Sequence, residues 1–247
     1  MGLVVSRWLS QNTHRIASLG LVMAALSTVT VASEGHAQPW AAPSSAAKAA
    51  RSEDPFDPSG LAEGPFSEMS ALLEVTIFKI DVLTLTIRVN EATAERLRSL
   101  AEGRRYSEEL ADSVATVILD ADDAWARQVF HRDVSLGRLV GGMRETGRKA
   151  AEAGFITPEY FEQFSENVPI WFGFLEESGA KKGDEILFLV RGNRLRTVYR
   201  TAGGRVLMDE GAEGAEARRA SIPSFFAPGT RFRKRLVESL LTSESGA

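Results

Sequence analysis

The sequence contains no cysteine, and this absence excludes two arrangements at once. A lipoprotein anchor is ruled out because its attachment needs a cysteine. Disulfide bonds are equally impossible, so an exported form must be stabilised by its apolar core alone, which a chain of this size can build. An excess of one charge is also missing, since 29 basic residues face 33 acidic ones for a net charge of −4. That balance predicts no general affinity for nucleic acid.

The N-terminus lacks a continuous apolar run of the roughly 20 residues that a membrane-spanning helix needs. It carries the parts of a signal peptide instead: Arg7, His14 and Arg15 precede an apolar stretch, and small residues lie just before Gln38. We therefore expect export to the periplasm or the medium, with cleavage after residue 37. Cleavage after residue 33 and an uncleaved anchor are the alternatives. Removal of residues 1–37 leaves a net charge of −5 and no stable membrane anchor.

Composition divides the rest of the chain into three parts. Residues 38–64 are rich in alanine, proline, serine and glycine without an apolar period, which predicts a disordered linker. Residues 243–247 are a polar tail. The folded domain is therefore predicted to cover residues 65–242.

Apolar periodicity within the domain predicts strands and helices in a mixed order. Residues 72–89 alternate between two faces and favour two strands joined near residues 79–81, or one long bent strand. Further strands are expected over 124–134 and in a ladder over 185–208 that turns at 203–204. Helices are expected to begin at four capping residues and near the C-terminus; the caps are Asn90, Ser107, Ser135 and Thr157. This order predicts the α+β class, a largely antiparallel β-sheet with helices packed on one face.

Two short motifs suggest catalysis or metal binding but lack their companions. His131-Arg132-Asp133 spells the catalytic tripeptide of protein kinases, yet position 138 is arginine where a kinase has asparagine, and the other kinase motifs are missing. The acidic turn at 120–123 lacks the glycine and the distal glutamate of a calcium-binding loop. We predict neither a metal site nor a cofactor, and no catalytic residue is assigned.

The most aromatic part of the chain follows Thr157. Tyr160, Phe164, Trp171 and Phe174 recur there at helical or near-helical spacing. They form either part of the core or one wall of an apolar ligand pocket, and the pattern leaves both interpretations open.

Four segments together resemble a known family. Residues 78–85 are similar to an early strand written FKVYxAxLY, residues 130–135 to an F-x-R-D-V-S junction, residues 181–184 to a K-K-G-D turn, and residues 222–241 to a leucine-rich closing helix. In this order they resemble bacterial chalcone isomerase-like proteins over residues 65–242, which implies the open-faced β-sandwich of the chalcone isomerase fold. The resemblance also implies structural roles: Arg132 in an ion pair near the strand end and Asp133 at the start of the next helix.

The resemblance does not extend to the enzyme's chemistry. Chalcone isomerases use an arginine on the first strand pair, a threonine on the next strand, and a tyrosine and an asparagine on the helix after the F-x-R junction. Here no arginine precedes Lys79 in that segment, Asp81 stands near the threonine position, and the helix over 135–153 has neither tyrosine nor asparagine. We therefore expect no chalcone isomerase activity.

Relatives in this fold include fatty-acid-binding proteins, in which a cleft between sheet and helices holds an acyl chain and an arginine or tyrosine holds its carboxylate. The resemblance thus implies a non-catalytic protein that binds a fatty acid or another apolar small molecule. Lys79, Arg132 and Tyr199 are the candidate ligand-binding residues. An isomerase or lyase with a non-standard residue set in the same cleft is the alternative, and a scaffold without ligand is a third possibility. The sequence leaves the oligomeric state open.

Overall fold

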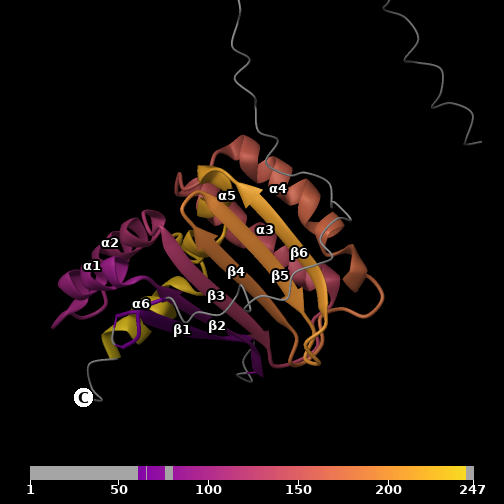
Figure 1. The fold of residues 1–247 in the computed structure, drawn as a ribbon, viewed down its shortest axis with the longest axis horizontal. Helices are drawn as coiled ribbons and strands as arrows, with labels where there is room; N and C mark the ends of the chain where they lie inside the picture. Colours follow the sequence, from indigo (N-terminus) through magenta and orange to yellow (C-terminus); the bar gives the residue numbers. More distant parts are fainter. Residues whose placement is uncertain (1–60, 65, 76–79, 243–247) are drawn as a thin grey trace, which may run out of the picture. The chain divides into compact units, whose positions relative to one another are not determined.

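Six antiparallel strands form one sheet, and they lie side by side in the order in which they occur in the chain (Figure 1). The computed structural model describes residues 61–64, 66–75 and 80–242. The predicted signal peptide, most of the predicted linker, the predicted tail and Lys79 lie outside the described residues. The strands are β1 (Glu68–Val75), β2 (Ile80–Val89), β3 (Asp123–Phe130), β4 (Glu185–Arg191), β5 (Arg194–Arg200) and β6 (Val206–Glu213).

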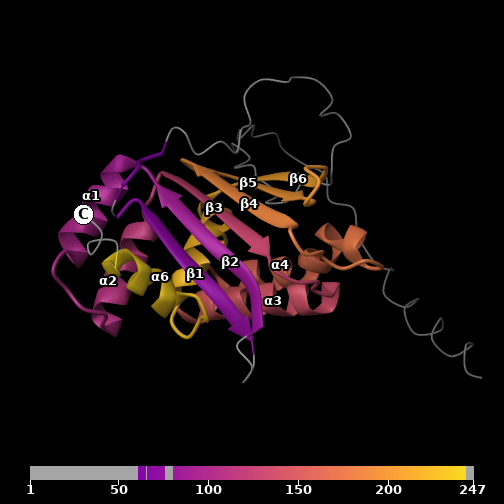
Figure 2. The ribbon, with the colours of Figure 1, turned by 90° about the horizontal axis from the view of Figure 1, so that it is seen from below.

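Helices pack against one face of this sheet, which we call the inner face (Figure 2). They are α1 (Glu91–Ala101), α2 (Glu108–Leu119), α3 (Leu136–Glu152), α4 (Pro158–Trp171), η2 (Gly173–Leu175), α5 (Ala215–Ala220), η3 (Ile222–Phe226) and α6 (Arg233–Thr242). Helix α6 packs on the edge strand β1, and α3 packs on α4 and η3. The α+β class with helices on one face of an antiparallel sheet, predicted from the sequence, is confirmed.

Strand alternation decides which side chains reach the core. On β2, Leu85 and Ile87 are fully buried, whereas the neighbouring Thr84 and Thr86 are only partly buried. Successive side chains of a strand point to opposite faces, so the buried alternate residues of β2 meet the helices. The two strands expected within residues 72–89 correspond to the β1–β2 pair, although β1 begins at Glu68, four residues before the predicted range.

Local capping chemistry fixes three helix starts as predicted. Asn90, Ser107 and Thr157 each accept a hydrogen bond from the backbone N–H three residues further on, at 3.0, 3.1 and 3.2 Å. Ser135 also precedes a helix, but its side chain makes no capping hydrogen bond.

Two further boundaries and one helix differ from the prediction. Strand β3 ends at Phe130 rather than 134, because the chain turns there and Val134 makes an isolated bridge with Ala180. Helix α5 was not predicted. Residues 61–64, assigned to the linker, contact the sheet: the Ala62 N–H donates to the carbonyl of Val89 at 3.2 Å.

The outer face of the sheet combines a small apolar cluster with ion pairs. Trp125, Leu187 and Val198 are buried there, with Leu61 packed against them. Glu185 is also buried, and its carboxylate accepts hydrogen bonds from Arg127 at 2.5 Å and from Arg200. A buried carboxylate is tolerated because two guanidinium groups compensate for its lost hydration. Within the described ranges, no helix is both long and apolar enough to cross a bilayer.

Candidate functional site

A cavity of about 560 Å³ lies between the inner face of the sheet and the helices α3, α4, α5 and η3. Its volume falls within the range of about 300–1,000 Å³ that is typical of small-molecule sites. It extends across the sheet from Leu73 on β1 to Glu210 on β6. Because neighbouring strands are spaced about 4.8 Å apart, those five steps span roughly 24 Å. The cavity is therefore long enough for an extended chain rather than only for a compact ring.

The sheet contributes mostly apolar side chains to this cavity. Phe130, Phe188, Leu195 and Met208 line it from β3 to β6, and each is buried. They share the cavity because they occupy inner-face positions of consecutive strands. The cross-strand register sets the middle row, in which Phe188 faces Thr197 and Thr197 faces Glu210.

The helices supply the opposite wall. Leu139, Met143 and Thr146 recur on one face of α3 and line the cavity. Of the predicted aromatic wall, Tyr160, Phe164 and Trp171 of α4 also line it. Phe174 does not: it lies in η2, is 39% exposed, and its ring packs on that of Tyr199 with the centroids 5.2 Å apart.

Four basic residues border the cavity, and we call them the basic rim: Arg132 after β3, Arg138 and Lys149 on α3, and Arg231 between η3 and α6. Lys149 pairs with Glu152 at 3.4 Å. The side chains of Arg132, Arg138 and Arg231 make no ion pair or hydrogen bond with another described residue, so three guanidinium groups remain available to an anion. The hydrogen bond from Arg148 chiefly, with smaller contributions from Lys149 and Arg231, lowers the pKa of Glu145, which also lines the cavity.

The basic rim begins at the junction that follows β3. His131 Nε2 lies 2.7 Å from Thr84 Oγ1, which ties the junction to β2. Asp133 accepts hydrogen bonds from the Lys182 N–H and the Lys181 Nζ, both at 3.0 Å. These bonds, that of Lys181 first, lower the pKa of Asp133.

This geometry corrects two roles expected from the family resemblance. Asp133 binds the turn before β4 rather than the start of α3. Arg132, expected in an ion pair, has none within the described residues and faces the cavity instead. The tripeptide at 131–133 thus combines a structural aspartate with an available arginine.

Tyr199, a predicted ligand-binding residue, does not line the cavity. It is fully buried, and its hydroxyl donates to Asp184 Oδ2 at 2.6 Å. Asp184 is also buried and accepts from the backbone N–H groups of Lys181 at 2.8 Å and Ala202 at 3.0 Å. Burial, followed by the Asp184 hydrogen bond, raises the pKa of Tyr199 far above its ordinary value. The Asp184 carboxylate therefore holds the β3–β4 and β5–β6 connections together, and the Tyr199 hydroxyl is its third donor.

Three polar residues of the sheet that the sequence reasoning did not single out line the cavity: Gln128, Thr197 and Glu210. They stand at inner-face positions, where most of their neighbours are apolar. Burial first, and then the nearby Asp209 carboxylate, raises the pKa of Glu210. Among the described residues, no group of three histidine, cysteine, aspartate or glutamate side chains could hold a metal ion.

No protein-family model matches the chain, and no curated protein matches it in sequence. Among solved structures, the chain is similar to a fatty-acid binding protein of Arabidopsis thaliana, with 11% identity and a TM-score of 0.45. The match covers 72% of this chain and 88% of the plant protein. A likeness at this level carries no conclusion about what this chain binds, and membership of the chalcone isomerase fold family stays a prediction from the sequence motifs.

Proposed function

We propose that the domain binds one amphipathic small molecule, a fatty acid, in the cavity between the sheet and helices α3 and α4. The observation that carries this proposal is the combination of an elongated apolar cavity with a basic rim. Apolar walls favour an acyl chain because they remove it from water, at about 0.8 kcal/mol for each buried CH₂ group.

The basic rim supplies what the head group needs. A carboxylate that leaves water without a partner is strongly disfavoured, so a fatty-acid site must offer a cation or several hydrogen-bond donors. A guanidinium group can bind both carboxylate oxygens at once, which favours Arg132 and Arg138 over a lysine for this role. Both side chains are exposed at the rim, so the head group would lie near solvent and the chain would extend inward.

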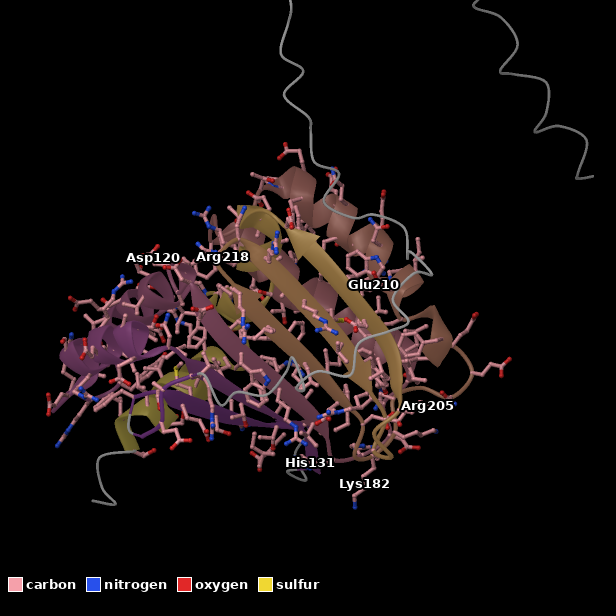
Figure 3. All side chains as sticks on the ribbon, in the orientation of Figure 1. Asp120, His131, Lys182, Arg205, Glu210 and Arg218 are labelled. Atoms are coloured by element: carbon pink, nitrogen blue, oxygen red, sulfur yellow. The ribbon has the colours of Figure 1, made fainter. Side chains whose placement is uncertain are left out.

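The proposal is tested by measuring the dissociation constant of a fluorescent fatty acid for the wild type and three arginine variants. Arg132→Met and Arg138→Met should each weaken binding, because methionine keeps the length of the side chain but not its charge. Arg205→Met is the matched control, since Arg205 is exposed in the turn between β5 and β6 and does not line the cavity (Figure 3). Wild-type protein that binds no acyl ligand at micromolar concentrations would contradict the proposal.

A second candidate is an isomerase or lyase that uses residues of the same cavity. The observation that favours it is Glu210, whose raised pKa is a property of many general acids and bases, beside the hydroxyl of Thr197. Turnover of a chalcone by the wild type, lost in Glu210→Gln, would establish this candidate in place of a binding function.

We also propose that the chain is exported and cleaved after Ala37. Support comes from the basic N-terminal segment, the short apolar stretch and the small residues before Gln38. Intact mass spectrometry of the mature protein should show the loss of residues 1–37. A stable species that retains Met1 would contradict export by this route.

A further inference from the structure

Three polar side chains interrupt the apolar inner face of the sheet, and all three line the cavity: Gln128, Thr197 and Glu210. None of them makes a side-chain hydrogen bond or an ion pair with another residue of the described ranges. Gln128 is only 7% exposed, yet its amide atoms are not among the fully buried ones, so they still meet solvent at the cavity. A ligand that fills the cavity removes this solvent, and a polar group then left without a partner carries a penalty.

Thr197 and Glu210 lie together where β5 and β6 line the cavity, and we call this pair the polar end. They are direct cross-strand partners on β5 and β6. The Cβ atoms of such partners lie about 5 Å apart, so a single ligand group can contact both side chains. The basic rim, by contrast, begins beside β2, where the His131 N–H donates to the carbonyl of Val82. Figure 3 shows Glu210 well separated from His131.

The chemistry of the two ends differs in a way that orients a ligand. An ionised Glu210 repels a carboxylate and can only accept hydrogen bonds. Thr197 can donate one hydrogen bond and accept others. A ligand group that satisfies both must donate a hydrogen, and a hydroxyl group does this while also accepting from Thr197. Gln128 lies between the two ends on β3, and its amide can donate to or accept from an oxygen along the chain.

We infer that the cavity takes a free fatty acid that is hydroxylated along its chain, with the carboxylate at the basic rim and the hydroxyl at Thr197 and Glu210. This inference rests on the proposed fatty-acid binding and adds the class of acid. An unsubstituted acyl chain would cover the three polar side chains without giving them partners, and that penalty is the source of selectivity.

The test is competition against a fluorescent fatty acid by three acids of equal length: one unsubstituted, one hydroxylated in mid-chain and one hydroxylated at the far end. At least one hydroxylated acid should bind wild-type protein about tenfold more tightly than the unsubstituted acid. Thr197→Val removes the hydroxyl at nearly constant volume, and Glu210→Gln removes the charge at nearly constant shape. Each should reduce that preference to about threefold or less.

Matched controls come from outside the cavity. Thr86→Val repeats the threonine change on β2 at a position between the buried inner-face residues, and Glu213→Gln repeats the glutamate change at an exposed position of β6. Both controls should keep the wild-type preference. Thermal melts of all variants show whether a lost preference reflects lost folding.

The possible outcomes separate the two proposals. Equal binding of all three acids by wild type would overturn the hydroxyl inference and leave the fatty-acid proposal standing. A preference that persists in both Thr197→Val and Glu210→Gln would also overturn it. Failure of every acid to bind would overturn both proposals.

Discussion

Replacing Tyr199 with phenylalanine removes one hydroxyl group from a buried strand and leaves the aromatic ring in place. That hydroxyl donates to Asp184 at 2.6 Å, in a part of the sheet where both residues are buried. A hydrogen bond to a charged group contributes about 1.5–3 kcal/mol to stability. Because the carboxylate keeps the N–H groups of Lys181 and Ala202, we expect a loss near the lower part of that range, about 2 kcal/mol.

Urea unfolding followed by circular dichroism measures this loss, with an unchanged m-value as the sign that only stability has changed. For a domain of this size, the melting temperature should fall by about 4–8 °C. Tyr106→Phe is the matched control, since the Tyr106 hydroxyl donates to Glu108 at 2.6 Å in an exposed position. The control should change stability by less than about 0.5 kcal/mol. If the two variants lost the same stability, the assignment of Tyr199 to a buried structural contact would be wrong.

The dependence on pH gives a second test of the same contact. In the unfolded chain Tyr199 ionises near its ordinary value of 10.0, whereas burial raises its pKa in the folded state. Above about pH 10 the unfolded state therefore binds fewer protons than the folded state, and wild-type stability decreases as pH rises. The phenylalanine variant lacks this effect. The stability difference between wild type and Tyr199→Phe should consequently narrow from about pH 9 to about pH 11.

Two further substitutions test the cavity and a turn. Burial and the Asp209 carboxylate raise the pKa of Glu210. Ionisation of Glu210 therefore destabilises the folded state once the pH exceeds 4.5, the pKa of this group in the unfolded chain. Glu210→Gln should consequently stabilise the protein against urea at pH 7, but not below about pH 4. Equal effects at both pH values would contradict this. Gly183 has φ of +85°, and an added Cβ would lie 2.9 Å from that of Ala202. Gly183→Ala should therefore cost about 2–4 kcal/mol, against about 1 kcal/mol for Gly192→Ala, where φ is +55° and no atom lies within 4 Å. Urea unfolding of Gly183→Ala and Gly192→Ala measures both losses of stability. A smaller loss for Gly183→Ala than for Gly192→Ala would refute the steric argument.

Local rules account for what the sequence predicted well. Asn90, Ser107 and Thr157 cap helices through atoms three residues away, so the capping pattern contains all the information needed. The alternation of side chains between two faces likewise predicted strands in the β1–β2 region, because this pattern depends only on neighbouring residues of the chain. Helix α5 was missed because its six residues, AEARRA, are too few to show an apolar period.

Site residues depend on tertiary packing, and there the sequence was a weaker guide. Trp171 and Phe174 are three residues apart, yet only Trp171 lines the cavity, because the α-helix ends before Phe174 and the chain continues as η2. Gln128 could have been found because it interrupts an apolar pattern. The other inner-face positions of β3, at 124, 126 and 130, are Ala, Ala and Phe, whereas position 128 is polar. A polar residue at such a position indicates a partner, and only the cavity shows where that partner would lie.

Two glycines of α3 allow the most direct test of the proposed binding site. Gly142 lines the cavity and Gly137 does not, and at both positions an added Cβ meets no atom within 4 Å. Both positions therefore accept a Cβ without a clash, and Gly142→Phe adds a ring at the wall of the cavity, while Gly137→Phe adds the same ring elsewhere on the helix. The decisive measurement is the dissociation constant of a fluorescent fatty acid for both variants and wild type. Ligand binding in the cavity predicts at least about tenfold weaker binding by Gly142→Phe and unchanged binding by Gly137→Phe. Equal affinities for all three proteins would contradict it.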